Sequence, residues 1–123
     1  MDKMPERGKS RVVSRRRVYA LFRKAKKILY PQEEVDFYLT HYYDDPSEAA
    51  LHFGRSCGEA GWEDGRYYIH LDVGRLATER DILRSLAHEF AHIRTGLEAT
   101  HDDPRFRKEE RMCLRMLKRA GLL

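Results

Sequence analysis

The chain has 123 residues, of which 41% are hydrophobic and 36% are charged, and a formal net charge of +4. This length fits one compact domain and excludes the large barrel and doubly wound enzyme folds, which need longer chains. Apolar runs of only a few residues exclude a membrane-spanning helix, which needs ~20 apolar residues, and two cysteines are too few for a disulfide scaffold.

The N-terminal segment carries the positive charge. Residues 1–30 contain 11 Lys or Arg against 2 acids, whereas the remainder contains 13 against 18. No apolar run follows this basic segment as it would in a secretory signal, so we expect a cytoplasmic protein. Residues 1–13 show no periodicity and are expected to form a flexible basic arm.

The first predicted helix begins after Ser14, a good N-cap residue. Apolar residues then recur every three or four positions up to Leu29, and Pro31 disfavours helix in the residue before it. The other faces of this helix are cationic, which is typical of a solvated surface or of a contact with nucleic-acid phosphates. The candidate nucleic-acid contacts are Arg15, Arg16, Arg17, Arg23, Lys24, Lys26 and Lys27.

Strands are predicted in the middle of the chain. Apolar and polar residues alternate over 35–40, and glycines interrupt apolar residues over 49–65. The sequence Glu63-Asp64-Gly65 is expected to turn the chain into a further strand over 66–72.

Two more helices are predicted in the C-terminal half. Thr78, with Asp81 three positions later, is close to a capping box, and pairs of apolar residues then predict a buried helix that ends near Gly96. An Asp-Pro pair at residues 103–104 predicts the start of a last helix that reaches about Ala120.

The buried helix carries the sequence His88-Glu89-Phe90-Ala91-His92, an H-E-x-x-H motif. Four residues are slightly more than one helical turn, so the two imidazoles project from the same side and can bind one cation. Neutral imidazoles suit Zn²⁺. Glu89 is rotated by about 100° from His88, from where it can act as a general base on a metal-bound water without being a ligand.

A catalytic zinc needs a third protein ligand and leaves a fourth position for water. His101 lies nine residues after His92, beyond the expected end of the helix, and is the first candidate. Glu109 and Glu110 on the last helix and Glu98 in the loop remain alternatives.

Other residues have weaker candidate roles. Cys57 could occupy the fourth zinc position and keep the site latent, because thiolates bind zinc well. Possible hydrogen-bond donors to a developing oxyanion are Tyr42, Tyr43, Tyr67 and Tyr68. The histidines expected to be ordinary strand or loop residues are His41, His52 and His70.

The run from Ser56-Cys57-Gly58 through Tyr68-Ile69-His70-Leu71 to the His88–His92 motif resembles the core of SprT-like zinc metallopeptidases. Residues 101–106 resemble the third-ligand segment of that family, and the likeness covers about residues 35–120. It implies an α+β fold over residues 14–123, a single-domain minimal zincin. A small, mostly antiparallel sheet would pack on the active-site helix, with a basic helix before it and a C-terminal helix after it.

The resemblance also implies a site. Zinc would be held by His88, His92 and His101, with Glu89 as the base. A second likeness, to minimal gluzincins, would instead give the third-ligand role to Glu109 or Glu110. Relatives of the SprT-like family include proteases that act on proteins bound to DNA.

The leading hypothesis is therefore a zinc metallopeptidase that hydrolyses a protein or peptide substrate. An extended peptide is expected to pair with an exposed sheet edge, for which strand 66–72 is the candidate. One alternative is a nucleic-acid-binding module that contacts DNA through the basic N-terminal segment. The other is a structural zinc module without catalytic turnover.

Overall fold

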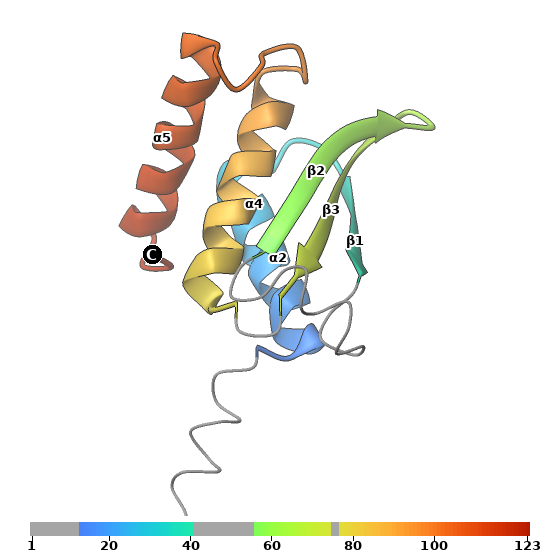
Figure 1. Ribbon diagram of the computed structural model, residues 1–123, viewed down its shortest axis with the longest axis vertical. Coiled ribbons are helices and arrows are strands. Elements are labelled where there is room, and N and C mark those ends of the chain that lie inside the picture. Colours follow the sequence, from blue (N-terminus) through green and yellow to red (C-terminus); the bar gives the residue numbers. More distant parts are fainter. Residues whose placement is uncertain (1–12, 41–55, 75–76) are drawn as a thin grey trace, which may run out of the picture.

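The computed structural model describes residues 13–40, 56–74 and 77–123, and the side chains of residues 56 and 57 are not described (Figure 1). The elements in chain order are α2 (Arg15–Leu29), β1 (Val35–Thr40), β2 (Ser56–Glu63), β3 (Arg66–Val73), α4 (Glu79–Arg94) and α5 (Pro104–Arg119). They confirm the expected α+β class, with a small sheet packed on helices. The predicted basic arm lies almost entirely outside the described residues, as do His41, Tyr42, Tyr43 and His52.

The sheet has the strand order β1-β3-β2. β3 pairs antiparallel with β2 and parallel with β1. The β2–β3 connection is a tight turn in which Asp64 and Gly65 have φ angles of 53° and 80°, the positive values that a type I′ hairpin requires. The prediction that strand 66–72 offers an exposed edge is wrong, because β3 is paired on both sides. Among the described strands, β2 pairs with β3 alone and is one edge of the sheet.

The helices cover one face of the sheet (Figure 1). On β3, Ile69, Leu71 and Val73 are buried towards the helices, whereas the residues between them are half-buried on the opposite face. Phe90 of α4 is fully buried, and Phe22 of α2 stacks on Phe37 of β1 at a ring-centroid distance of 4.3 Å. The core therefore lies between the sheet and the helical layer.

Local hydrogen bonds fix both ends of α4. At its start, the Asp81 backbone N–H donates to Thr78 Oγ1 (3.1 Å), and the Thr78 backbone N–H donates to Asp81 Oδ2 (2.9 Å). This is a complete capping box. At its end, Gly96 has a φ of 73°, and the Leu97 backbone N–H donates to the His92 carbonyl at 2.8 Å. Such an end satisfies the last helical carbonyls.

Polar contacts hold α2 along α4. Arg17 donates two hydrogen bonds to Glu79, at 2.7 and 3.0 Å, near the starts of both helices. Arg94 donates to the Leu29 carbonyl at 2.6 Å near their ends. α2 and α4 therefore run side by side in the same direction.

α5 runs antiparallel to α4 (Figure 1). It begins at Asp103, whose side chain accepts a hydrogen bond from the Arg105 backbone N–H at 2.8 Å, and Pro104 occupies the first turn. Its buried residues are Phe106, Cys113 and Leu117. None of the helices in the described part of the chain is long and apolar enough to cross a membrane.

Candidate metal centre

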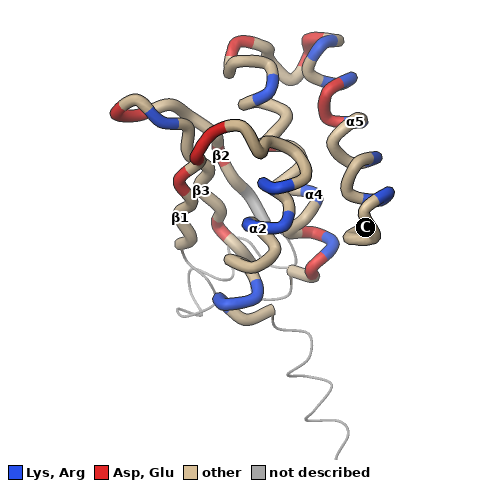
Figure 2. Tube along the Cα trace, turned by 180° about the vertical axis from the view of Figure 1, so that it is seen from behind, with Lys and Arg blue, Asp and Glu red and all other residues tan. Residues whose placement is uncertain are grey.

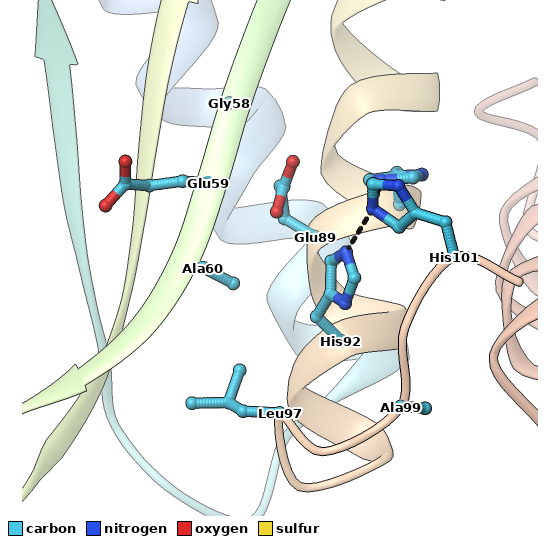
Figure 3. Close-up of a pocket in the computed structure, with 9 residues that line it drawn as sticks. Gly58, Glu59, Ala60, Glu89, His92, Leu97, Ala99 and His101 are labelled. Carbon is cyan, nitrogen blue, oxygen red and sulfur yellow. Dashed lines mark hydrogen bonds between the residues drawn. The ribbon is translucent and has the colours of Figure 1, made fainter. Parts of the chain in front are cut away.

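Three histidine rings meet at one point beside the sheet. His101 Nε2 lies 3.2 Å from Nε2 of His88 and 3.0 Å from Nε2 of His92 (Figure 3). Within the described residues, these three side chains form the group of candidate ligand atoms that all lie within 4.8 Å of one another. The sequence-predicted third histidine is thus brought to the H-E-x-x-H pair.

Two elements and a loop position these rings. His88 and His92 lie one turn apart on α4, and His101 comes from the loop that joins α4 to α5. Phe106, in the first turn of α5, is 1% exposed, and its ring packs against all three imidazoles. Its ring stacks on His92 at 4.3 Å and meets His88 edge-on at 5.0 Å. The start of α5 therefore holds the imidazoles together.

The spacing of the three nitrogens fits a zinc ion. Nitrogens bound at ~2.0–2.1 Å to one tetrahedral zinc lie ~3.3 Å apart, close to the 3.0 and 3.2 Å observed. As hydrogen bonds the two contacts compete, because His101 Nε2 carries at most one proton. A cation satisfies all three lone pairs at once.

The acidic alternatives for the third ligand lie elsewhere. Glu110 Oε2 accepts a hydrogen bond from His88 Nδ1 at 2.8 Å, on the side of the ring away from the other histidines. Glu109 pairs with Arg94 at 3.3 Å, and Glu98 is exposed in the loop. Neither Glu109 nor Glu110, the alternatives on the last helix, joins the group of the three histidines, and Glu110 contacts His88 instead. In a neutral ring this bond places the proton on Nδ1 and leaves Nε2 free, as carboxylates behind metal-bound histidines do.

Glu89 is buried between α4 and β2, with 4% of its surface exposed. Burial raises its pKa to about 7, and the nearby carboxylates of Glu59 and Glu110 add to this, while His88 opposes it. The carboxylate therefore lies near the balance between its charged and neutral forms at neutral pH.

Gly58 of β2 makes room for Glu89. A Cβ atom at this position would lie 2.6 Å from Leu71 Cδ2, 2.9 Å from the His70 carbonyl oxygen and 3.3 Å from Glu89 Oε2. No side chain fits there. Gly58 is a site residue that was not predicted, although a glycine inside a strand is a signal of close backbone approach.

Burial also lowers the pKa of His92 to about 4, and the neighbouring His88 and His101 act in the same direction. The ring is therefore neutral at physiological pH. A neutral imidazole is the form that binds a metal ion.

A cleft of about 370 Å³ opens over the histidines. Figure 3 shows its two ends: Glu89 and Gly58 lie at one, and Leu97 and Ala99 lie at the other. Leu97 has a φ of 66°, an uncommon conformation for a residue with a side chain, and it lines the cleft from the end of α4. The full lining is Gly58, Glu59, Ala60, His88, Glu89, His92, Leu97, Ala99 and His101.

The other candidate residues on β3, the tyrosines proposed as oxyanion donors and His70, make contacts outside the cleft. The Tyr68 hydroxyl donates to Glu59 at 2.9 Å, and the Tyr67 ring packs edge-on against Trp62 at 4.7 Å. Neither tyrosine lines the cleft. His70 Nε2 lies 2.8 Å from Thr40 Oγ1, so it is an ordinary strand histidine, as expected.

The basic helix α2 shows some of its cations to solvent and uses others structurally. Arg17 is paired with Glu79, and Lys26 donates to the Tyr30 carbonyl at 3.2 Å. Figure 2 shows Lys and Arg along this helix. The exposed ones are Arg15, Arg16, Arg23, Lys24 and Lys27.

The chain thus combines an α+β core, three converging imidazoles, a buried carboxylate and an edge strand along one cleft. Comparisons with protein-family models, with curated proteins and with solved structures give no match.

Proposed function

We propose that the chain is a zinc-dependent metallopeptidase of the zincin type. The observation that carries the proposal is the position of His101 Nε2, 3.2 and 3.0 Å from the Nε2 atoms of the H-E-x-x-H histidines. The resemblance of the sequence to SprT-like metallopeptidases supports the same function. His88, His92 and His101 would hold the ion.

Each side chain of the site has a task in this proposal. A zinc ion bound there would supply the positive charge that polarises a substrate carbonyl and acidifies a water. Glu89 accepts a proton from water in the cleft and later passes it to the leaving amine nitrogen. Glu110 keeps the Nε2 atom of His88 free of a proton by accepting a hydrogen bond from Nδ1.

The substrate would lie along β2. Among the described strands it pairs with β3 alone, and its residues 58–60 line the cleft. An extended peptide that adds to a strand edge is held by backbone hydrogen bonds, which do not depend on its side chains. We therefore expect cleavage at many different sequences.

A structural zinc module is the competing function. Structural zinc sites have four protein ligands, whereas the cluster found among the described residues has three. Glu89 has no task in such a module, and its burial would only destabilise the fold. The buried carboxylate of Glu89 favours a site with one position left for water.

The proposal is tested with purified, zinc-loaded protein and casein as substrate. Glu89→Gln should keep the metal and abolish hydrolysis, whereas His101→Ala should lose the metal. Glu63→Gln is the matched control, because Glu63 lies on the same strand and is exposed but does not line the cleft. Full activity of Glu89→Gln would refute the mechanism. Addition of DNA to the same assay tests whether DNA-associated proteins are the substrate class and whether exposed cations of α2 contribute.

A further inference from the structure

A second groove lies on the surface between α4 and α5 and shares no lining residue with the cleft over the histidines. It has a volume of about 360 Å³, similar to that of the cleft over the histidines. This is within the range of sites that bind small ligands or short peptide segments. The groove, which we call the α4–α5 groove, is lined by Arg80, Arg84, Leu114, Arg115, Lys118 and Leu123.

Helical spacing places the α4–α5 groove next to the metal centre. Arg84 precedes His88 by four residues on α4, and Leu114 follows Glu110 by four residues on α5. His88 and Glu110 are hydrogen-bonded to each other, and the two helices are antiparallel. The groove therefore begins about one helical turn, or ~6 Å, from the His88–Glu110 bond.

The side chains that line the α4–α5 groove carry four positive charges and no negative charge. Arg80, Arg84, Arg115 and Lys118 are all exposed, and none forms an ion pair with any described residue. No Asp or Glu side chain is among the residues that line it. Like charges around a concave surface repel one another, so a bound anion is favoured.

The lining of the groove is also partly apolar. Leu114 and Leu123, both half-buried, line it together with the four cationic side chains. No aromatic side chain lines it, although sites for single-stranded nucleic acids stack bases on aromatic rings. A peptide that alternates acidic and apolar residues matches both features, because its carboxylates would pair with the arginine and lysine side chains and its apolar side chains would pack on the two leucines.

We propose that the α4–α5 groove binds an acidic, amphipathic peptide segment of a partner protein. This binding depends neither on the metal nor on hydrolysis. A partner held there would have the rest of its chain close to the cleft, and this consequence, unlike the binding itself, rests on the proposed peptidase function.

The test measures fluorescence anisotropy with the full zinc-loaded chain carrying Glu89→Gln, so that no probe is cleaved. The probes are a short peptide of alternating Asp and Leu, the same peptide with Ser in place of Leu, and an oligothymidylate of equal charge. Arg84→Glu combined with Arg115→Glu should weaken binding of the Asp-Leu peptide by about tenfold or more. The matched control, Arg23→Glu combined with Lys27→Glu on α2, changes the net charge equally and should weaken it by less than about twofold.

The Asp-Leu peptide should also bind several-fold more tightly than the Asp-Ser peptide and the oligothymidylate. The substituted residues are exposed, so both double variants should fold, and thermal unfolding of each variant checks this. Equal losses in the two variants would show a non-specific charge effect and overturn the proposal. So would failure of the Asp-Leu peptide to bind, equal binding of the Asp-Ser peptide, or tighter binding of the oligothymidylate that the groove variant abolishes.

Discussion

The tight packing around Gly58 leads to a prediction about the stability of the fold. In Gly58→Ala, the added methyl group would lie 2.6 Å from Leu71 Cδ2, whereas carbon atoms in contact are normally ~3.5–4.0 Å apart. It would also lie 2.9 Å from a backbone oxygen, that of His70, which cannot rotate away. Overpacking of this kind costs about 1–3 kcal/mol. For a domain of this size, a loss of about 2 kcal/mol lowers the melting temperature by ~6–10 °C.

Gly61→Ala is the matched control on the same strand. The atoms that its Cβ would meet belong to the Tyr68 ring, at 2.5–2.6 Å, and a partly exposed side chain can move aside. We expect a loss below about 1 kcal/mol for this variant. Urea unfolding of the metal-free proteins measures both. Equal losses at the two positions, or no loss at Gly58, would refute the tight packing of Gly58 against Leu71 and the His70 carbonyl.

Three further predictions concern the site. Glu110→Gln should weaken zinc binding about 10–100-fold, with Glu109→Gln as a control that stays near the wild-type affinity in a calorimetric titration. The raised pKa of Glu89, about 7 against 4.5 when unfolded, means that the folded metal-free protein holds a proton that the unfolded chain releases. The free energy of unfolding of the metal-free protein should therefore fall as pH rises from about 4.5 to 7. Glu89→Gln should remove this loss and raise the free energy of unfolding by at most about 3 kcal/mol at pH ~8, with no gain at pH ~4. Equal stability of the two proteins at pH ~8 would contradict the burial of a charge. Zinc should be released as pH falls from ~6.5, the reference pKa of a free imidazole, towards the pKa of about 4 of His92, because protonated imidazoles do not bind a metal ion, and full retention at pH ~3 in a dialysis experiment would argue against histidine ligands.

The sequence predicts well what short-range chemistry determines. Thr78 and Asp81 lie three residues apart, and the capping box that they predict is present. Asp103 starts α5 as expected, and the turn at Asp64 and Gly65 has the backbone angles of a hairpin. The meeting of His101 with the motif histidines was also predictable, because the helix ends near Gly96 and leaves the chain free to turn back.

Features that depend on distant parts of the chain were not predictable. Alternation in residues 66–72 shows that a strand is half-buried, but not that β1 pairs with its other side and leaves β2 as the edge. The charge count along the chain places an excess of cations only in residues 1–30. The α4–α5 groove gathers its cations from two helices that are distant in the sequence, so no sequence window reveals it.

The most direct test of a zinc site with one open position is X-ray absorption at the zinc edge on the purified chain, together with metal analysis. The account predicts one zinc per chain, bound by three imidazole nitrogens and one water oxygen at ~2.0–2.1 Å. Absence of zinc would contradict it. A fourth ligand at the ~2.3 Å of a zinc–sulfur bond would also contradict it, because Cys57 would then close the position that water must occupy.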